Sequence, residues 1–441
     1  MPQNLQAIDY DETLPAQADV VVIGGGVAGV STALSLAEKG VSVAVCEKGE
    51  VAAEQSSRNW GWTRLMGRDP REIPLAIESL RLWRDMDRRV GADTGFRQAG
   101  TLWLADTRQQ LEAYQAWLEH AREWQLDSRL LDADGIADVL PGMTRRFAGA
   151  LYTPSDGRAE PLRAVPAMAT AARRLGAKVF RQCAVRGIET KAGAVSAVIT
   201  ERGRIACSAA VLAGGVWSRL FCGNLDLFLP QLKIVGSVLR TEPMDGLPET
   251  AVGAGTFAFR KRADGGYTVA RRNGNMADIT PDSFRLLPDF LPTLRTTWRE
   301  VRLRAGSRFF EEWRTKRRWS LDEASPFEAV RVLDPAPSQA RLDEAVRDLK
   351  QAYPAFAAMR VAETWGGMID VTPDAVPVIS PVRALPGFYV GTGFSGHGFG
   401  IGPGAGRLMA DLVTGDEPIV DPTPYAFERF RPHLHVKGGR A

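Results

Sequence analysis

The sequence predicts an α/β fold that joins a nucleotide-binding domain with a parallel sheet to a second, α+β domain with a mostly antiparallel sheet. A β-branched run at 19–23 passes through consecutive glycines into an apolar helical stretch, as expected for a buried strand–turn–helix unit. Two later strand-like runs, at 209–213 and 387–392, also end in glycine-rich segments. Candidate strands of the antiparallel sheet are 100–105, 232–240, 257–261 and 266–271.

The first unit has the order of a Rossmann-like dinucleotide-binding motif. Glycines separate the first strand from a helix expected at 30–39, and a second strand at 41–46 ends in an acid. In this motif one glycine permits the tight turn, another lets the backbone approach a pyrophosphate, and a third lets helix and strand pack closely. These roles fall to Gly24, Gly26 and Gly29, and Glu47 is expected to bind the ribose hydroxyls.

The loop after this unit favours FAD over NAD as the dinucleotide. Small hydroxyl residues and a glycine occur within 54–62, which suits a loop that runs from the pyrophosphate toward an isoalloxazine ring. A nicotinamide enzyme would normally continue into another βαβ unit, whereas this chain continues into a helix expected at 74–90.

The middle of the chain supplies further elements of the same domain. A helix is expected at 162–175, strands at 178–180 and 183–185, and a hairpin at 187–200. The glycine-containing segment 214–218 either passes along the cofactor or is a plain strand end.

The C-terminal third contains a second glycine-rich loop, Gly393–Gly402. Its backbone can approach a flat ring closely because most of its residues lack a side chain. A helix is expected at 403–414, and the partial positive charge of its N-terminus would stabilise an anionic reduced flavin. His397 lies in this loop and is either functional or structural.

The composition argues against several other classes of protein. Charged residues make up 24% of the chain and the formal net charge is +3, which gives no support to nucleic-acid binding. The four cysteines form no CxxC pair and have no metal-ligand spacing with the four histidines, so no metal site is expected. Residues 1–18 lack the apolar core of a secretory signal. The uncharged stretch 20–37 contains four glycines and is better explained as buried structure than as a membrane span.

Together these motifs resemble the D-amino-acid oxidase and sarcosine oxidase superfamily of flavoproteins. The glycine fingerprint, Glu47, the serine-rich loop, Ala213–Ser218, Thr372–Asp374 and Gly393–Gly400 occur here in the family's order. The chain is most similar to bacterial L-amino acid deaminases and oxidases. The segments that carry this closer similarity are 54–58, 214–216, 218–221, 325–328 and 353–356.

The resemblance implies an enzyme with two discontinuous domains. The FAD-binding domain would comprise 1–97, 152–225 and 360–441, and the substrate domain 98–151 and 226–359, with the substrate bound between them. The implied reaction is FAD-dependent oxidation of the Cα–N bond of an L-amino acid: hydride passes to flavin N5, and the imine hydrolyses to a 2-oxo acid and ammonia. The electron acceptor would be O2 or a quinone.

Two alternatives remain open. One is an oxidase or dehydrogenase of secondary amines, such as sarcosine or cyclic amino acids, or of D-amino acids. The other is a catalytically silent FAD-binding subunit.

The resemblance also implies which residues form the site. Arg272 matches the deaminases' carboxylate-binding arginine, and a guanidinium group binds a carboxylate through two parallel hydrogen bonds; otherwise it is a surface charge. Arg64 matches an arginine beside the flavin ring, unless it forms an interdomain salt bridge. His397 and Trp365 are expected to line the pocket, whereas Trp60, Trp62 and Trp103 are more typical of a core. The expected cofactor-binding residues are Gly24, Gly26, Val27, Ala28, Gly29, Glu47, Lys48, Gln55, Ser56, Ser57, Arg58, Asn59, Trp60, Gly61, Val185, Gly214, Gly215, Trp217, Gly396, His397, Gly398, Phe399, Gly400 and Ile401.

The chain departs from its presumed relatives in ways that shape the remaining expectations. It lacks the deaminases' N-terminal membrane segment, and the part matching their membrane-associated insertion, Ser283–Trp313, is rich in arginine. A cytoplasmic protein without membrane attachment is therefore expected, with homo-oligomerisation left open. Monomeric sarcosine oxidases attach their flavin to a cysteine at the position that matches Gly367. No cysteine lies near Gly367 here, so the resemblance implies that the FAD is non-covalent. Gly400 replaces the lysine with which sarcosine oxidases bind substrate, so the carboxylate needs another partner.

Overall fold

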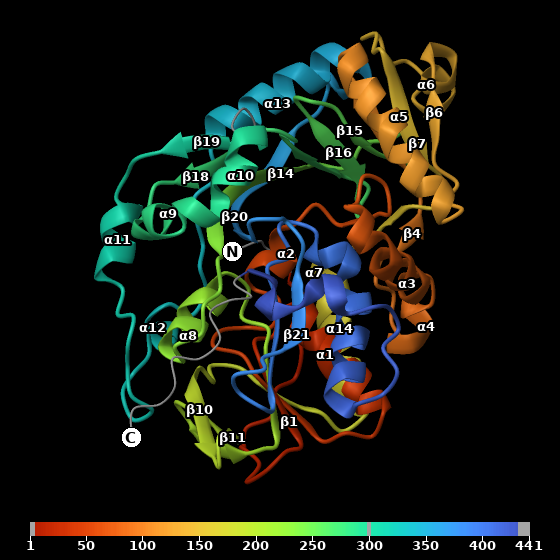
Figure 1. The fold of residues 1–441 in the computed structure, drawn as a ribbon. Helices are drawn as coiled ribbons and strands as arrows, with labels where there is room; N and C mark the ends of the chain where they lie inside the picture. Colours follow the sequence, from red (N-terminus) through yellow and green to blue (C-terminus); the bar gives the residue numbers. More distant parts are fainter. Residues whose placement is uncertain (1–4, 298–300, 431–441) are drawn as a thin grey trace.

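The computed structural model describes residues 5–297 and 301–430 and shows an α/β architecture of two stacked layers. The lower layer in Figure 1 is built on a six-stranded, mainly parallel sheet, and the upper layer on a ten-stranded, mainly antiparallel sheet. This is the fold class that the sequence predicts.

The six-stranded sheet is assembled from three distant parts of the chain. Its strand order is β21-β22-β13-β1-β2-β9, and only β21 runs antiparallel to its neighbour. The bounds are β1 Val20–Ile23, β2 Val43–Cys46, β9 Lys178–Phe180, β13 Ala209–Leu212, β21 Val378–Pro381 and β22 Phe388–Thr392. Both faces are covered, because Val20 and Val22 pack in the core on one side and Val21 and Ile23 in the core on the other.

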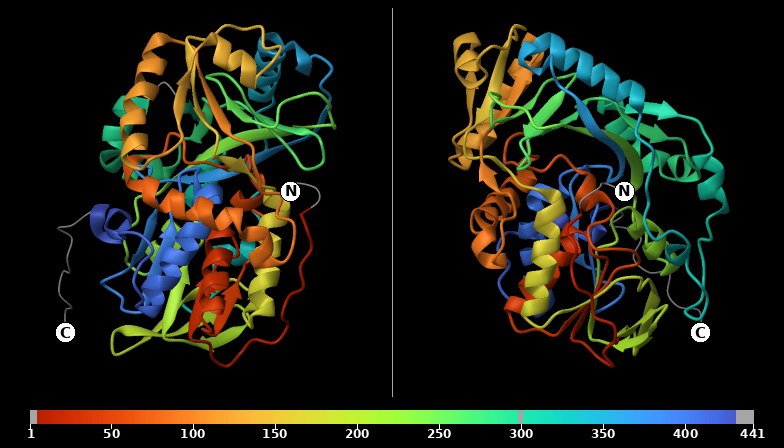
Figure 2. Two further views of the ribbon diagram at one scale, coloured as in Figure 1. Left: turned by 90° about the vertical axis from the view of Figure 1, so that its right-hand side faces the viewer. Right: turned by 180° about the vertical axis from the view of Figure 1, so that it is seen from behind.

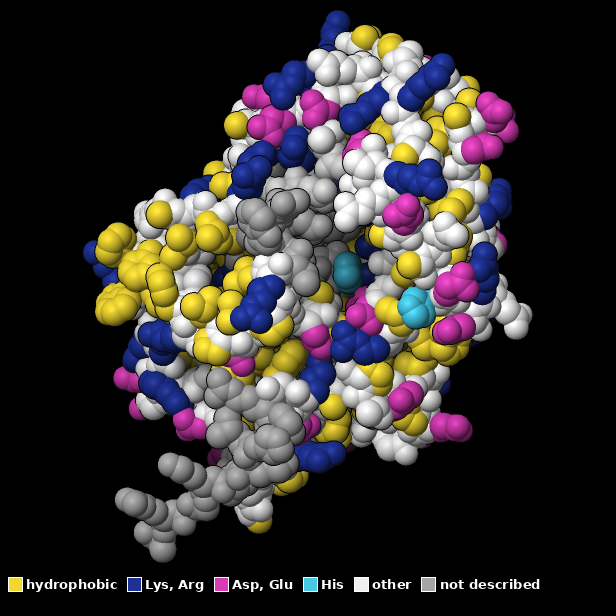
Figure 3. All heavy atoms as spheres, turned by 45° about the horizontal axis from the view of Figure 1, so that its top comes forward, with side chains coloured by type: hydrophobic (Ala, Val, Ile, Leu, Met, Phe, Trp, Pro, Cys, Tyr) yellow, Lys and Arg dark blue, Asp and Glu magenta, His cyan; other side chains and the backbone are white. Residues whose placement is uncertain are grey.

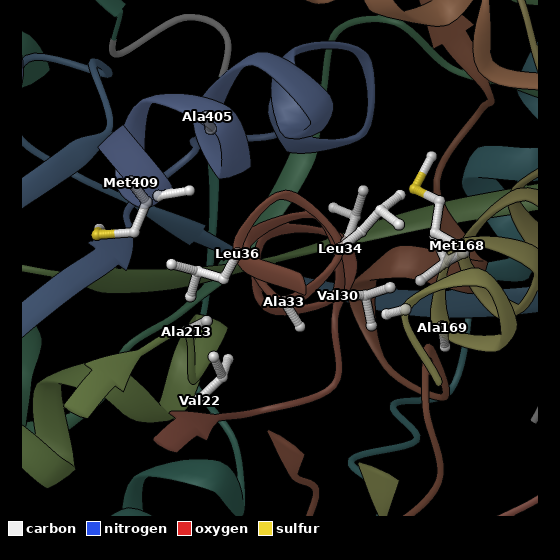
Figure 4. Packing of buried hydrophobic residues seen from close by; sticks show 14 of the residues in the cluster. Val22, Val30, Ala33, Leu34, Leu36, Met168, Ala169, Ala213, Ala405 and Met409 are labelled. Carbon is white, nitrogen blue, oxygen red and sulfur yellow. The ribbon is translucent and has the colours of Figure 1, made fainter. Parts of the chain in front are cut away.

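Helices cover one face of this sheet. Helix α1 (Val27–Glu38) lies between α7 (Pro161–Arg174) and α14 (Gly398–Thr414), and the three helices are seen side by side in Figure 2. In Figure 4 the side chains of Val30, Leu34 and Leu36 on α1 lie among residues from β1, α7 and α14. The opposite face is covered by a three-stranded sheet of β10 (Val185–Lys191), β11 (Ala194–Thr200) and β12 (Gly203–Ala206).

Several sequence-based element boundaries are wrong. The helix expected at 74–90 is divided at Asp85 into α3 (Ile73–Arg84) and α4 (Met86–Val90), and residues 183–184 precede β10 rather than forming a strand. Asp85 joins the two helices with a backbone φ of −100° and ψ of 0°, outside the helical region.

The glycine loop near the C-terminus also differs from its prediction, because helix α14 begins at Gly398 and not at 403. Its glycines allow contacts too close for any side chain: a Cβ on Gly406 would lie 2.4 Å from Ser31, and one on Gly402 would lie 2.6 Å from Val27. Ser79 of α3 supplies hydrogen bonds to the helix backbone around Pro403. Its hydroxyl accepts from Gly404 N and donates to Gly400 O. Tertiary packing thus outweighs the low helix propensity of glycine.

The ten-stranded sheet forms the upper layer. Its order is β19-β18-β14-β17-β16-β15-β5-β7-β6, and β20 pairs with β14 along its length. The bounds are β5 Thr101–Ala105, β6 Arg129–Leu131, β7 Gly149–Thr153, β14 Leu232–Thr241, β15 Ala251–Gly253, β16 Ala258–Lys261, β17 Tyr267–Ala270, β18 Asn275–Asp278, β19 Val301–Arg304 and β20 Val361–Val371. A domain boundary at residue 360 assigns β20 to the FAD-binding domain. In the structure β20 pairs with β14 in the upper sheet, and the chain continues from its end into the lower layer.

The remaining elements surround these two sheets. A small sheet of β3 (Trp62–Thr63), β8 (Gly157–Arg158) and β4 (Arg97–Gln98) lies where the layers meet. Helix α13 crosses the top of the upper sheet in Figure 1. The other helices are α2 Gln55–Arg58, α5 Arg108–Glu123, α6 Ala133–Val139, α8 Ser218–Asn224, α9 Pro281–Arg285, α10 Leu287–Thr297, α11 Arg308–Arg314, α12 Pro326–Ala329 and α13 Gln339–Ala352.

The segment expected to match the membrane-associated insertion forms α9, α10, β19 and α11, apart from residues 298–300, which lie outside the described part. It exposes large apolar side chains, seen as the yellow group at the left edge of Figure 3. They are Phe284, Leu287, Leu291, Leu303, Phe310 and Trp313. Within the described residues, no helix has the length and hydropathy needed to span a bilayer.

Candidate active site

A cavity of about 530 Å³ is lined by residues of both layers. This volume falls in the range of small-molecule and cofactor sites. One end is lined mainly by the loops that follow β1, β2 and β13, and the other by side chains from β3, β5, β14 and the turn after β17.

The glycine fingerprint forms the first end with the geometry that a phosphate site needs. Gly24 has a φ of +109°, and a Cβ there would lie 2.5 Å from Ala213 O, so only glycine fits this turn. A Cβ on Gly29 would lie 2.1 Å from Gly24 O, which explains the third glycine as a packing requirement. A Cβ on Gly26 would meet only the Ser56 hydroxyl, at 3.2 Å, and would otherwise point into free space. The space next to Gly26 is therefore open to a ligand.

Glu47 lies at the end of β2 and lines the same part of the cavity. Its carboxylate accepts hydrogen bonds from the backbone N–H groups of Gly25 and Gly49, each at 2.7 Å. Burial raises the pKa of Glu47, although Lys48 and these two N–H groups oppose the rise. The carboxylate is thus held beside the glycine turn, where the sequence motif places the ribose.

The short helix α2 connects the phosphate end of the cavity to its middle. The Ser56 hydroxyl accepts from Val27 N at the start of α1, and the Asn59 side chain accepts from Gly61 N at 2.7 Å. The buried Arg58 guanidinium donates to Gly366 O at 2.9 Å and pairs with Asp334. These bonds fix a loop that follows the wall of the cavity from α1 toward β3.

Most of the residues expected to bind the cofactor line this cavity, and four expected site residues do not. Gly29 and Ser57 lie behind the phosphate end, and Ile401 is buried within α14. Trp365 packs against Val238, Ala270 and Trp60 and donates its Nε1–H to Arg58 O. Trp365 therefore supports the wall from behind, since β20 directs its indole ring into the layer between the two sheets.

The second end of the cavity is built around Trp103. The guanidinium carbon of Arg272 lies 3.7 Å from the centroid of this ring, and that of Arg64 lies 4.8 Å from it. Tyr114 of α5 accepts a hydrogen bond from Arg272 at 3.2 Å. A cation over an indole ring is stabilised by the ring's quadrupole, so Trp103 and Tyr114 together hold Arg272 in one orientation.

Adjacent arginines after β17 have different surroundings. Arg271 lies 3.2 Å from Glu344 and 3.7 Å from Asp348 on α13. In the described part of the chain, no carboxylate lies within 4.0 Å of the guanidinium groups of Arg272, Arg64 or Arg68. These three cations line one cavity without a carboxylate partner in the described part of the chain, which favours the binding of an anion at this end.

Trp60, Trp62 and Trp103, which the sequence assigns to a core, all line the cavity. Trp62 is also buried in a small apolar cluster with Ala251 and Ala258, and the other two tryptophans pack against that cluster. Strand alternation explains the position of Trp103: Leu102 and Leu104 of β5 face the core, so Trp103 between them faces the other way. Gly253 leaves room for both rings, because a Cβ there would lie 3.2 Å from Trp62 and 3.3 Å from Trp103. Because Leu102, Trp103 and Leu104 are all apolar, the sequence does not show which of them faces the cavity, and it does not reveal the role of Gly253.

Two buried carboxylates balance part of the positive charge. Asp156 accepts from Leu65 N at 2.6 Å and so holds the turn that carries Arg64; burial raises the pKa of Asp156 to about 7. Glu72 is fully buried and lies 3.4 Å from His397 Nδ1. Sequence reasoning missed both residues, because neither belongs to a recognisable motif.

Asp370 is a third buried acid, on the wall between the two ends of the cavity. It accepts hydrogen bonds from Gly393 N at 2.7 Å, Gln231 Nε2 at 2.9 Å and Thr392 Oγ1 at 3.2 Å. Burial raises the pKa of Asp370. These bonds tie β20 to the end of β22, which positions the glycine loop before α14.

The residues present fit a flavin dinucleotide. The open space over Gly26, the carboxylate at the end of β2 and the N-terminus of α1 suit a pyrophosphate and ribose. Gly396, Gly398 and Gly400 line the middle of the cavity, so that backbone can lie against a flat ring. The four cysteines are all free and buried, and no cysteine occupies position 367.

Known proteins resemble this chain over most of its length. A family model described as "DAO: FAD dependent oxidoreductase" matches residues 19–412. The structure of L-amino acid deaminase from Proteus myxofaciens, solved in complex with anthranilate, is similar with a TM-score of 0.94 and 36% identity, over 97% of each chain. Glycine oxidase from Pseudomonas putida is 27% identical over 93% of this chain and 98% of its own length. Sarcosine oxidase subunit beta from Arthrobacter sp. is 26% identical over 96% of this chain and 94% of its own.

Proposed function

Since the chain belongs to the DAO family of FAD-dependent oxidoreductases, we propose that it oxidises the Cα–N bond of L-amino acids. The product is an imine, which water hydrolyses to a 2-oxo acid and ammonia. FAD is the cofactor, and O2 or a quinone is the proposed acceptor of its electrons.

The observation that carries this proposal is the cation at the second end of the cavity. Arg272 is free of carboxylate partners in the described structure and is held by Trp103 and Tyr114. A guanidinium group in this position suits a substrate carboxylate. The similarity to the Proteus deaminase extends over almost the whole chain and supports an L-amino acid as the bearer of that carboxylate.

We propose a separate task for each part of the cavity. Gly24, Gly26, the N-terminus of α1 and Glu47 bind the pyrophosphate and ribose of FAD without a covalent bond, and the segments 55–61, 214–217 and 396–400 enclose the rest of the cofactor. Bound FAD supplies the hydride acceptor. Arg272 holds the carboxylate so that Cα–H faces the flavin, and Trp60, Trp62 and Trp103 exclude water and contact the substrate side chain.

A second candidate is supported by sequence relatives. Glycine oxidase and a sarcosine oxidase subunit match most of this chain at lower identity, so a small, N-methylated, cyclic or D-amino acid is the alternative substrate class. Such substrates also carry a carboxylate, and Arg272 alone does not discriminate between the classes.

Anaerobic bleaching of the flavin tests the proposal. Purified holoenzyme is mixed with a panel of L-, D- and N-methyl amino acids, and the absorbance of oxidised flavin is followed. We expect rapid bleaching by L-amino acids and little by their D-enantiomers. Faster bleaching by sarcosine, proline or D-amino acids would favour the second candidate. Flavin colour that persists with every amino acid of the panel would support a catalytically silent FAD-binding subunit.

A further inference from the structure

Glu72 is a buried carboxylate that is not among the residues proposed to bind FAD or the substrate carboxylate. It is the last residue of the 3₁₀ helix η1 (Pro70–Glu72) and is fully buried. Neither of its oxygens has a hydrogen-bond partner in the described part of the chain. Its neighbour is His397, with Nδ1 3.4 Å from Oε2. A buried carboxylate is costly unless it is paired, so this contact requires an explanation.

The side chain of His397 is not used to cap helix α14. His397 is the N-cap residue of α14, but its side chain makes no capping hydrogen bond. Its Nδ1 is buried on the side of Glu72, while 26% of the side chain stays exposed and lines the cavity. With the proton on Nδ1 facing Glu72, Nε2 becomes a hydrogen-bond acceptor on the cavity side.

The charges around His397 favour a neutral imidazole beside an ionised carboxylate. Burial and Arg68 lower the pKa of His397, Arg64 adds to this, and Glu72 opposes it. Burial alone would raise the pKa of Glu72, but His397 and the two arginines outweigh it and hold this pKa below its usual value. His397 also contributes to lowering the pKa of Asp69, at the surface end of the same turn. A neutral imidazole backed by a carboxylate can accept a proton and stabilise the resulting cation.

We propose that His397 and Glu72 form a proton-accepting pair that removes a proton from the substrate's ammonium group before oxidation. This inference rests on the proposed function. One N–H bond of the ammonium breaks, its electrons remain on nitrogen as the lone pair, and the proton bonds to His397 Nε2. The neutral amine can then lose hydride from Cα to FAD, the cofactor on which the family depends. His397 returns its proton to water afterwards. Glu72 does not touch the substrate and acts as a positioning residue.

The pH dependence of His397→Gln tests the pair. Without a base, only the neutral amine reacts, so log kcat/KM rises with unit slope up to the pKa of the substrate's ammonium group. With the pair, the zwitterion itself is used, and the wild-type profile is flat over the same range. We expect His397→Gln to lose about 10²–10⁴-fold in kcat/KM near neutrality and to acquire the unit slope. A variant profile parallel to that of the wild type would overturn the proposal.

Glu72→Gln separates positioning from support of the fold. Removing the carboxylate charge removes a contribution that raises the pKa of His397, so this pKa falls. The acidic limb of kcat/KM, where protonated His397 cannot accept, therefore moves to lower pH, and the plateau decreases because the base is weaker. FAD content stays at the wild-type level. Lost FAD with an unmoved limb would assign Glu72 a structural role only. Glu78→Gln, on the surface of α3 beside Arg81, is the matched control and leaves the profile unchanged.

A titration that needs no turnover distinguishes failure of this pair from failure of the proposed function. The imidazole signals of the holoenzyme are followed by NMR, and His397 is identified by the signal lost in His397→Gln. The chain has only four histidines, so the assignment is direct. We expect the His397 pKa to be lower in Glu72→Gln than in the wild type, even if no amino acid bleaches the flavin. An equal pKa in both proteins would overturn the pair whatever the substrate proves to be.

Discussion

The two ends of the cavity are made of different parts of the polypeptide. The phosphate end is formed mostly by backbone: the glycine turn after β1, the first turn of α1 and the loop after β13. The opposite end is formed by long side chains, with Trp103, Arg272 and Arg64 stacked together from β5, the turn after β17 and the turn after β3. One end thus depends on the absence of side chains, and the other on their mutual support.

This difference determines how each end responds to substitution. A site formed by backbone fails when a side chain occupies the space that the ligand needs, and the failure is complete because the ligand cannot bind elsewhere. A site formed by stacked side chains loses function by degrees, because each member supports the others and can be partly replaced. The following variants test this contrast in order of decreasing effect.

Gly26→Val should abolish FAD binding and leave the polypeptide folded. A Cβ at this position meets only Ser56 Oγ, at 3.2 Å, so the apoprotein can accommodate the change, whereas a pyrophosphate cannot approach. The ratio of flavin to protein absorbance measures cofactor content, and circular dichroism measures the fold. Full flavin occupancy in this variant would show that the cofactor does not use the glycine turn.

Gly29→Ala is the matched comparison for the fold. Its Cβ would lie 2.1 Å from Gly24 O, so the helix and the turn cannot both keep their positions. We expect poor folding even in the apoprotein, in contrast to Gly26→Val. Similar melting temperatures for the two apoproteins would contradict this division of roles.

Arg272→Ala should reduce kcat/KM by roughly ten- to 150-fold with FAD still bound. A charge-assisted contact is worth about 1.5–3 kcal/mol, at about 1.4 kcal/mol per tenfold change in rate. Arg272→Lys should recover only part of the loss, since an ammonium group lacks the planar fork. Arg271→Ala is the control and should have a far smaller effect, because Arg271 already pairs with Glu344 and Asp348.

An amine without a carboxylate sharpens this test. The wild type should oxidise it poorly, and Arg272→Ala should be little worse. Equal losses for the amine and the amino acid would mean that Arg272 supports the flavin or the fold, and Arg64 would be the next candidate for the carboxylate.

Tyr114→Phe should have the smallest effect of the series. It removes the hydroxyl that accepts from Arg272 and keeps the ring that packs on Trp103, with ring centroids 6.0 Å apart. A lost hydrogen bond of about 0.5–1.5 kcal/mol predicts roughly a two- to tenfold rise in KM, with little change in kcat or FAD content. A change in kcat alone would place Tyr114 in the chemistry and not in substrate binding.

The same contrast explains what the sequence could predict. Close approach of backbone demands glycine at fixed spacing, so Gly24, Gly26, Gly29 and the terminal acid Glu47 were recognisable from one sequence. Five of the six strands of the mainly parallel sheet were also recognisable, because burial on both faces requires continuous apolar, often β-branched runs. The exception is β21 (Val378–Pro381), the antiparallel strand at the edge.

The arginine and tryptophan end left weaker signals. Arg272 is inferred only through family resemblance. Tyr114 beside it and Glu72 beside His397 lie in segments with no motif. Trp103 is expected in the core because a tryptophan in a strand is usually buried, and its apolar neighbours Leu102 and Leu104 give no sign of which face it takes. Trp365 was expected in the pocket wall but lies behind it, since the direction of its ring depends on the pairing of β20 with β14, which local sequence does not encode.

The contact between α1 and α14 has a consequence for how the protein is made. Helix α1 ends at Glu38 and α14 begins at Gly398, so the ribosome completes almost the whole chain before the groove around Val27 and Ser31 receives its partner. Until then the small, apolar face of α1 stays uncovered and the flavin cradle lacks one wall. Because contacts between distant segments form slowly and leave intermediates prone to aggregation, yield in a heterologous host should depend on growth temperature and chaperone supply, and less on how much riboflavin is provided early in synthesis.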